Sequence, residues 1–206
     1  MLDYIALDFE TTGYSAETCD IIEIGAWKVR KGVVSDKFCT LVRPVMYIPR
    51  TIQELTGITN EMVADYDTIE SVLFEFYDFC EDLPFLGHNL PFDYRFLEYR
   101  GKFLGLDFSL KGQRQGVDTL QLSKKLLPDL PSHKLVAVAD YLGVNAGNRE
   151  TSEYHRAGFD AYVTKLVYDR FLFTYPNILD VTNPKLLNMG DEKYGKVVNN
   201  DTLSFV

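Results

Sequence analysis

"IALDFETTG", residues 5–13, is the stretch of sequence that decides the fold. Its apolar residues are typical of a buried β-strand, and two acids, Asp8 and Glu10, stand near the end of that strand. Successive side chains of a strand point to opposite faces, so the two carboxylates share one face. Neighbouring carboxylates are costly unless a cation neutralises them or one takes up a proton. Crowded oxygen ligands of this kind suit Mg²⁺ or Mn²⁺ rather than zinc.

The composition is that of an ordinary globular protein. The chain has 206 residues, of which 46% are hydrophobic, and this is enough for the core of a single domain. Three widely spaced cysteines, without a CxxC pair, predict neither a disulfide framework nor a zinc site. No basic leader and no apolar run of about 20 residues are present, so we expect a soluble, cytoplasmic protein that does not bind membranes.

The charge of the chain is unevenly distributed. The formal net charge is −9, which argues against a general surface for binding polyanions. Residues 95–134 nevertheless hold eight Lys and Arg against four Asp and Glu. This basic stretch is either a solvated helical face or a rim that follows phosphate groups.

The order of the expected elements predicts an α/β fold with a mixed sheet flanked by helices. Strands are expected at 2–9, 21–30 and 33–42, the last two joined by a hairpin about Gly32, and a short central strand at 83–89. Apolar periodicity predicts helices over 51–63, 67–80, 91–103, 117–128, 133–144 and 151–173. From 176 onward the sequence has no clear period, so we expect a core domain over 1–175 and a C-terminal extension over 176–206, with a small hairpin at its end.

Two later stretches carry further polar residues that bear on chemistry. "GHNLPFDYRFL", residues 87–97, places Asp93 in the first turn of a helix directly after a buried strand. "YHRAGFDAYVT", residues 154–164, sets His155 five residues ahead of Asp160. Five residues exceed one helical turn, so we expect His155 on the loop before the helix and Asp160 on the helix, facing the sheet. Taken singly, Asp93 could be a helix-terminus charge and His155 a surface histidine.

Together the three motifs, "LDFETTG", "GHNLPFDYRFL" and "YHRAGFDA", resemble in order and spacing the 3'-to-5' exonucleases with a DEDD signature and a histidine in the third motif. This family includes DnaQ-like proofreading (epsilon) subunits and exonuclease domains of bacterial DNA polymerase III. The resemblance covers roughly residues 2–172. The branch of the superfamily with a tyrosine in the third motif is disfavoured, because it would need tyrosine where this chain has Arg156. The resemblance implies a ribonuclease H-like fold with a mixed five-stranded sheet.

The resemblance also implies a role for each residue of the motifs. Two Mg²⁺ or Mn²⁺ ions would be held by Asp8, Glu10, Asp93 and Asp160, with His155 as general base. The acids would stand close together because they hold two neighbouring cations. Substrate contacts are expected from four residues: Thr11 and Thr12 toward the terminal 3'-hydroxyl, Leu55 of "LTGIT" beside the terminal base, and Asn89 near the scissile phosphate. For Thr11 and Thr12, simple turn chemistry is the alternative.

Three functions remain open from the sequence. The first is a metal-dependent 3'-to-5' exonuclease that removes nucleoside 5'-monophosphates from single-stranded or frayed DNA ends, as in proofreading. The second is the same chemistry on short RNA, as in oligoribonuclease, which an acidic protein fits somewhat better. The third is a non-catalytic module that docks on a DNA polymerase subunit or a sliding clamp, against which the filled catalytic positions argue. For the first two functions, the partner is the 3' end of a nucleic acid. Of the two nucleic acids, DNA is favoured over RNA.

Overall fold

The computed structural model describes residues 3–108, 115–144, 156–175 and 187–188. His155 and nearly all of the extension from residue 176, including its expected hairpin, lie outside the described residues. Within the described part, no helix combines the length and the apolar character needed to cross a membrane.

The centre of the molecule is one mixed sheet. Its strands are β1 (Tyr4–Thr11), β2 (Ile21–Arg30), β3 (Val33–Leu41), β4 (Phe85–Gly87), β5 (Gln115–Asp118) and β6 (Leu187–Asn188), in the spatial order β3-β2-β1-β4-β5-β6. Strands β1 to β3 form an antiparallel meander, β4 and β5 continue the sheet parallel to β1, and β6 runs antiparallel to β5. The β2–β3 turn uses positive φ at Lys31 and Gly32, as the hairpin prediction requires.

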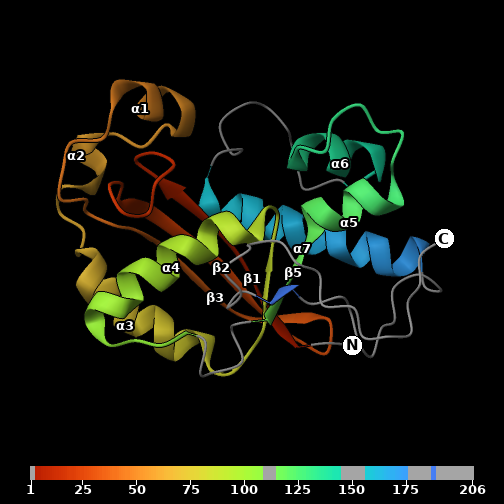
Figure 1. Ribbon diagram of the computed structural model, residues 1–206, viewed down its shortest axis with the longest axis horizontal. Helices are drawn as coiled ribbons and strands as arrows, with labels where there is room; N and C mark the ends of the chain where they lie inside the picture. The colour runs from red at the N-terminus through yellow and green to blue at the C-terminus, as the bar shows by residue number, and fades with distance from the viewer. Residues whose placement is uncertain (1–2, 109–114, 145–155, 176–186, 189–206) are drawn as a thin grey trace.

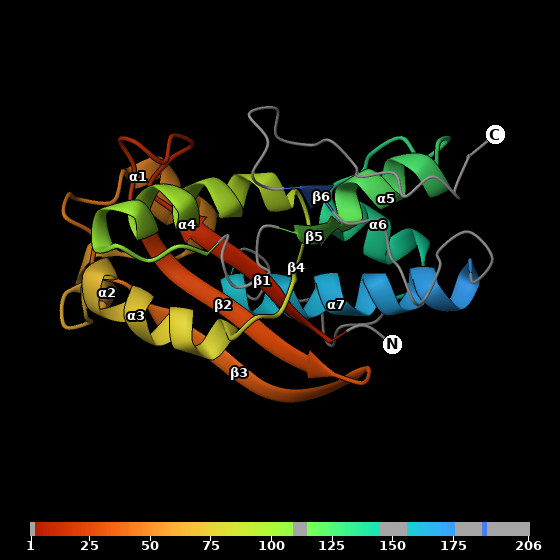
Figure 2. The ribbon, with the colours of Figure 1, turned by 60° about the horizontal axis from the view of Figure 1, so that its bottom comes forward.

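Helices cover both faces of this sheet. They are α1 (Arg50–Thr56), α2 (Asn60–Val63), α3 (Ile69–Cys80), α4 (Leu90–Leu104), α5 (Thr119–Leu126), α6 (Leu135–Tyr141) and α7 (Ala157–Thr174). On one face Ile5, Leu7 and Phe9 of β1 pack with α3 and α4, and on the other Tyr4 and Ala6 pack with α5, α6 and α7. Figures 1 and 2 show α7 crossing the strands. Since α7 lies against the face to which Ala6 points, it also lies over Asp8 and Glu10.

The sequence prediction of the fold is confirmed for the mixed sheet and its flanking helices. Strand β5 was not predicted, because its last two residues, Val117 and Asp118, were assigned to the following helix. A strand of four residues is too short for its alternation to be distinguished from the first turn of a helix. The sheet also gains the two-residue strand β6 from the extension.

One close contact fixes the distance between α7 and the sheet. A Cβ atom built on Gly25 of β2 would lie 2.1 Å from the carbonyl carbon of Ala157 and 2.1 Å from the nitrogen of Gly158. The indole N–H of Trp27 also donates to the Gly158 carbonyl at 2.7 Å. Glycine at position 25 therefore lets the first turn of α7 rest directly on β2.

Gly25→Ala is expected to destabilise the protein and to displace the start of α7. Overpacking of this kind costs roughly 1–3 kcal/mol, because the backbone of α7 must move away. Urea unfolding should show the loss of stability. Thermal melts with and without Mn²⁺ should show a smaller stabilisation by the cation than in the wild type, because Asp160 moves with the helix.

Gly143→Ala is the control for this substitution. Gly143 has φ +63°, and its Cβ would meet nothing within 4 Å, so the change adds backbone strain without displacing α7. It should lower stability while leaving the response to Mn²⁺ intact. A Gly25→Ala protein with wild-type stability would contradict the tight contact.

Candidate active site

Three carboxylates converge at the centre of the sheet. Asp8 and Glu10 come from β1, and Asp160 comes from the first turn of α7. One oxygen from each of the three lies within 4.8 Å of the others. Asp160 is buried, with 9% of its surface exposed. The alternation of β1 and the crossing of α7 therefore bring together residues that are 150 positions apart, on the face that the sequence predicts.

Asp93 lies next to this group, although it is not one of the three converging acids. It is buried in the first turn of α4, and its Oδ1 accepts the backbone N–H of Phe9 at 3.0 Å. The parallel pairing of β1 with β4 includes only Ile5 and Ala6, so the N–H of Phe9 has no partner in β4. The Asp93 carboxylate takes that place and is thereby fixed between Asp8 and Glu10 along β1.

The entry into α4 is held by Asp118, a residue that the sequence analysis did not select. Asn89, the N-cap of α4, has left-handed backbone angles of φ 71° and ψ 41°. Its N–H donates to Oδ1 of Asp118 at 2.8 Å, and the same oxygen accepts the N–H of Leu120 at 2.9 Å. Asp118 therefore joins the end of β5 to the turn that aims Asp93. "VDTL" carries the signal, since aspartate before a helix is a preferred N-cap.

The electrostatics of the group favour cations. Burial, and then the charges of Asp160 and Glu23, raise the pKa of Glu10 to about 8. Burial raises the pKa of Asp93 to about 8, although the N–H of Phe9 acts in the opposite direction. The pKa of Asp8 lies well above its ordinary range, again through burial first and then through the other acids. Without cations these acids retain protons near neutral pH.

The donor set fits divalent cations with a preference for oxygen. The converging atoms are carboxylate oxygens, with no sulfur or nitrogen among them. Hard cations such as Mg²⁺ and Mn²⁺ bind such oxygens, and their charge would relieve the repulsion that raises the pKa values. The residues present are therefore suited to the ions that the sequence predicts.

An ion pair between the buried Glu23 and the partly exposed Arg156 anchors the start of α7. Arg156 donates from Nε to both carboxylate oxygens of Glu23, at 3.0 and 3.1 Å, and from a terminal nitrogen to Oε1 at 2.7 Å. Oε2 of Glu23 also accepts the N–H of Ala157 at 2.8 Å. Glu23 is opposite Glu10 in the β1–β2 register. The pair thus fixes the segment that leads from Arg156 to Asp160.

Sequence analysis missed this pair. Arg156 was considered only because it is not tyrosine, and Glu23 was treated as part of an ordinary strand. An acid inside the apolar run "IIEIGA" was the available signal, since a buried carboxylate requires a partner. The identity of that partner, 133 residues away, depends on the path of α7.

The residues expected to contact substrate lie in the turn after β1, on α1 and at the start of α4. The Thr11 hydroxyl donates to the carbonyl of Gly13 at 2.7 Å, and the Thr12 hydroxyl accepts the N–H of Asp20 at 2.9 Å. Both side chains therefore hold the turn after β1, which is the alternative interpretation of these threonines. Leu55 on α1 is 52% exposed, as a residue that contacts substrate must be. The roles of Thr11, Thr12, Leu55 and Asn89 toward substrate stay predictions.

His88 cannot replace His155 as a base. Its Nε2 is 2.8 Å from the carbonyl oxygen of His133, which can only accept, so Nε2 carries the proton. Its Nδ1 lies 2.9 Å from the hydroxyl of Thr119, which is also 3.1 Å from the carbonyl oxygen of Gly87. Burial lowers the pKa of His88 to about 4, so the ring is neutral and both nitrogens are engaged. The predicted role of general base therefore stays with His155.

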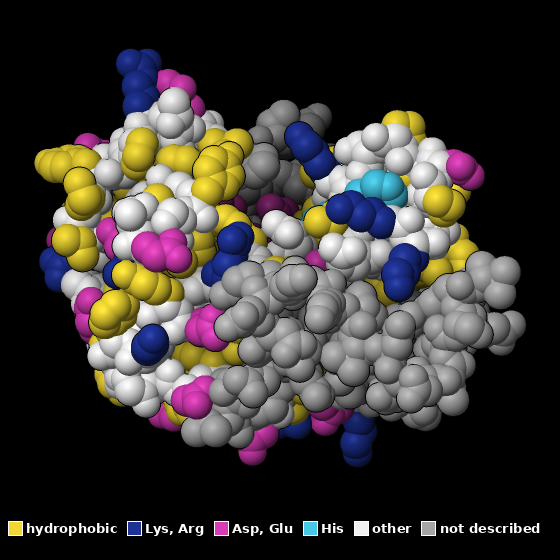
Figure 3. Space-filling view, in the orientation of Figure 1, with side chains coloured by type: hydrophobic (Ala, Val, Ile, Leu, Met, Phe, Trp, Pro, Cys, Tyr) yellow, Lys and Arg dark blue, Asp and Glu magenta, His cyan; other side chains and the backbone are white. Residues whose placement is uncertain are grey.

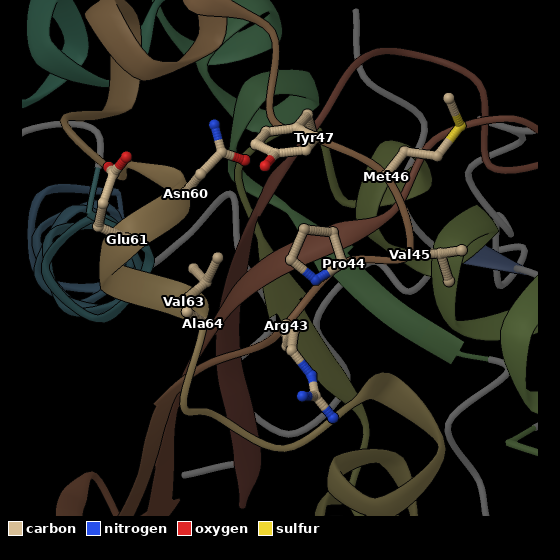
Figure 4. A pocket seen from close by; sticks show the side chains of 9 residues that line it. All are labelled: Arg43, Pro44, Val45, Met46, Tyr47, Asn60, Glu61, Val63 and Ala64. Atoms are coloured by element: carbon tan, nitrogen blue, oxygen red, sulfur yellow. The ribbon is translucent and has the colours of Figure 1, made fainter.

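An open pocket of about 330 Å³ lies apart from the acids, between α2 and the segment that follows β3. Its side chains are shown in Figure 4: Arg43, Pro44, Val45, Met46, Tyr47, Asn60, Glu61, Val63 and Ala64. Val45, Met46 and Tyr47 are 82%, 72% and 85% exposed. The pocket includes none of the four acids, so it is not the candidate active site.

Comparison with known proteins identifies the family of this chain. A model of the RNase T exonuclease family matches residues 5–168. The DNA polymerase III PolC-type protein of Thermotoga maritima is 43% identical over 170 residues, which are 82% of this chain but 12% of that protein. The DNA polymerase III subunit epsilon of Aquifex aeolicus is 35% identical over 174 residues, 82% of this chain and 80% of that protein. The chain therefore spans only a small part of the PolC-type proteins.

Solved structures agree with the fold. Exonuclease X, in complex with 5' overhanging duplex DNA, superposes with a TM-score of 0.66 at 26% identity, over 85% of this chain and 93% of that chain. The nuclease domain of 3'hExo, a DEDDh family member, has a TM-score of 0.68 at 21% identity, over 84% of this chain and 92% of that chain, and shows the fold alone. The ribonuclease H-like fold is confirmed. The chain belongs to the exonuclease family, as its three motifs predict.

Proposed function

We propose that this chain is a divalent-metal-dependent 3'-to-5' exonuclease that removes nucleoside 5'-monophosphates from single-stranded or frayed DNA ends. The observation that carries the proposal is the convergence of Asp8, Glu10 and Asp160 within 4.8 Å, with Asp93 fixed beside them on β1. Neighbouring carboxylates whose pKa values are raised by burial and mutual repulsion are typical of a hydrolytic site that works with bound cations.

We assign the roles of the residues from the three motifs and from the described positions of the four acids. Asp8, Glu10 and Asp160 would hold two Mg²⁺ or Mn²⁺ ions, with Asp93 completing the site. Bound divalent cations supply stabilisation of the negative charge that develops on the phosphate and on the leaving oxygen. His155, next to the anchored Arg156, would accept the proton of the attacking water. Water adds to phosphorus, the bond to the 3' oxygen breaks, and the shortened strand keeps a 3'-hydroxyl.

DNA is the proposed substrate because of the proteins that this chain resembles. Both relatives described above are named as DNA polymerase III proteins, and the Exonuclease X structure contains DNA. The names of the same relatives support a DNA polymerase subunit as a partner in proofreading, and a sliding clamp is the alternative partner. The extension over 176–206, which follows the core domain over 1–175 and adds β6 to the edge of the sheet, would be available as a tether. Short RNA is the alternative substrate, because the chain is acidic.

The proposal is tested by incubating the protein with end-labelled DNA and RNA of matched sequence and length. Turnover should require Mg²⁺ or Mn²⁺, stop in excess EDTA and release mononucleotides from the 3' end of DNA. Asp160→Asn is the inactive control. Faster digestion of RNA would support the ribonuclease alternative. No digestion of either substrate by the wild type would support a docking module.

Metal-free protein is expected to lose stability as the pH rises. The folded-state pKa of Glu10, about 8, lies above its ordinary value of 4.5, so folding favours the protonated acid. That contribution is complete below the ordinary pKa and is lost as the pH rises through about 8. In EDTA the Tm should therefore fall between pH 5 and pH 9. A change of 1 kcal/mol corresponds to roughly 2–4 °C for a chain of this size.

Mn²⁺ should reverse this trend, because the cation competes with the protons and binds better as they leave. Differential scanning calorimetry of the wild type and Glu10→Gln, with EDTA or Mn²⁺, separates Glu10 from the other titrating groups. The variant should show a flatter pH dependence in EDTA. Identical pH profiles for the two proteins would contradict the raised pKa of Glu10.

His155→Ala and Asp160→Ala are expected to differ in one respect. Loss of His155 removes proton transfer only, so turnover should fall on the order of 10²- to 10⁴-fold while Mn²⁺ still raises the Tm. Loss of Asp160 removes a ligand, so turnover and the Mn²⁺ response should both disappear. Single-turnover assays and thermal melts give the two readings. Near wild-type turnover of His155→Ala would remove the general-base assignment.

A further inference from the structure

Three exposed lysines form a basic surface next to the acids. Lys124 and Lys125 lie in the last turn of α5, and Lys134 directly precedes α6. We call these three residues the lysine rim. Figure 3 shows Lys and Arg side chains over α5 and α6, on the face of the molecule seen in Figure 1. We propose that the lysine rim binds the phosphates of the nucleic-acid strand on the 5' side of the scissile bond.

Hydrogen bonds join the rim to the turn that aims Asp93. The ring of His88 is hydrogen-bonded to the carbonyl of His133, the residue before Lys134, at 2.8 Å. The hydroxyl of Ser123, the residue before Lys124, is 3.0 Å from Nδ1 of His133. His88 itself is followed by Asn89, the N-cap of α4. The rim is therefore built onto the same segment that leads into Asp93.

The electrostatics of His88 also indicate that Lys124 lies near the turn into α4. Lys124 is close enough to His88 for its positive charge to help lower the pKa of that ring, although burial is the larger cause. Asp118, which caps α5, accepts the N–H of Asn89. Both elements of the rim thus keep a fixed position relative to the start of α4.

Helix chemistry accounts for only part of the rim. Lys124 and Lys125 lie at the C-terminal end of α5, where a positive charge complements the helix dipole. Lys134 stands at the opposite kind of position, the N-cap of α6, where a positive charge is unfavourable and a side-chain acceptor is preferred. Because the whole chain has a net charge of −9, a local group of lysines stands out as a positively charged surface on an otherwise acidic protein.

The opposite side of the acids carries apolar groups. Tyr14, in the loop after β1, is 86% exposed, and Leu55 on α1 is 52% exposed. Figure 3 shows acidic side chains deep in a hollow between the surface over α1 and α4 and the surface over α5 and α6. A single strand has bases on one side and phosphates on the other. This asymmetry fits bases toward Tyr14 and Leu55, and phosphates toward the lysine rim.

The inference rests on the proposed function, and the salt dependence of catalysis tests it. Each phosphate contact on a single strand contributes about 0.7 to the slope of log affinity against log salt. In Lys124→Gln/Lys134→Gln, the slope of log kcat/KM on a single-stranded 12-mer should therefore be smaller by about 1.4. On a dinucleotide, which has no phosphate on the 5' side of its scissile bond, the same variant should match the wild type.

Lys31→Gln/Lys37→Gln is the control with the same change of charge. Both residues are exposed and lie on the β2–β3 side of the sheet, at the other end of the strand order from β5 and α5. This variant should keep the wild-type slope. If the rim variant also keeps it while the wild type digests both substrates, the inference is wrong and the proposed function stands. If the wild type digests neither substrate, the proposed function itself fails.

Discussion

The repulsion among buried carboxylates is the constraint on which the rest of the structure depends. Asp8, Glu10 and Asp160 gather where burial and their own charges raise the pKa values of the site. Such a cluster would relax apart if its elements could move, since each acid gains from better solvation. The sheet prevents this for Asp8 and Glu10, because β1 pairs along its length with β2. For Asp160, the anchoring of α7 has the same effect.

The anchoring of α7 shows how an acid is buried when it serves structure. Glu23 is buried, like Asp93 and Asp160, but it binds Arg156 through both oxygens and also accepts the N–H of Ala157. Its charge is compensated within the protein. After burial, the other acids are the largest influences on the pKa values of Asp8 and Glu10, and Arg156 acts on Glu10 in the opposite direction. The contrast separates a completed ion pair from a group of acids whose charge the neighbouring residues do not compensate.

Local patterns made much of this arrangement predictable. The alternation in β1 placed Asp8 and Glu10 on one face, and the motif around Asp160 placed it on a helix against the sheet. Glu23–Arg156 and Asp118–Asn89 were not predicted, because each joins residues that are 133 or 29 positions apart. Strand β5 was missed for a related reason, since its four residues form a strand only beside β4. The periodicity of the sequence indicates which face of a helix or strand is buried. It does not indicate which other element packs against that face.

Asp93 shows how the ends of strands create a position for chemistry. The parallel pairing of β4 with β1 stops at Ala6, and β1 continues to Thr11. Beyond that point the N–H groups of β1 on the β4 side need partners, because an unpaired buried N–H is costly. Asp93 supplies one for Phe9, and the same bond stabilises its ionised form although burial acts against it. The early end of β4 therefore leaves room for α4 to bring a fourth carboxylate to the centre of the sheet.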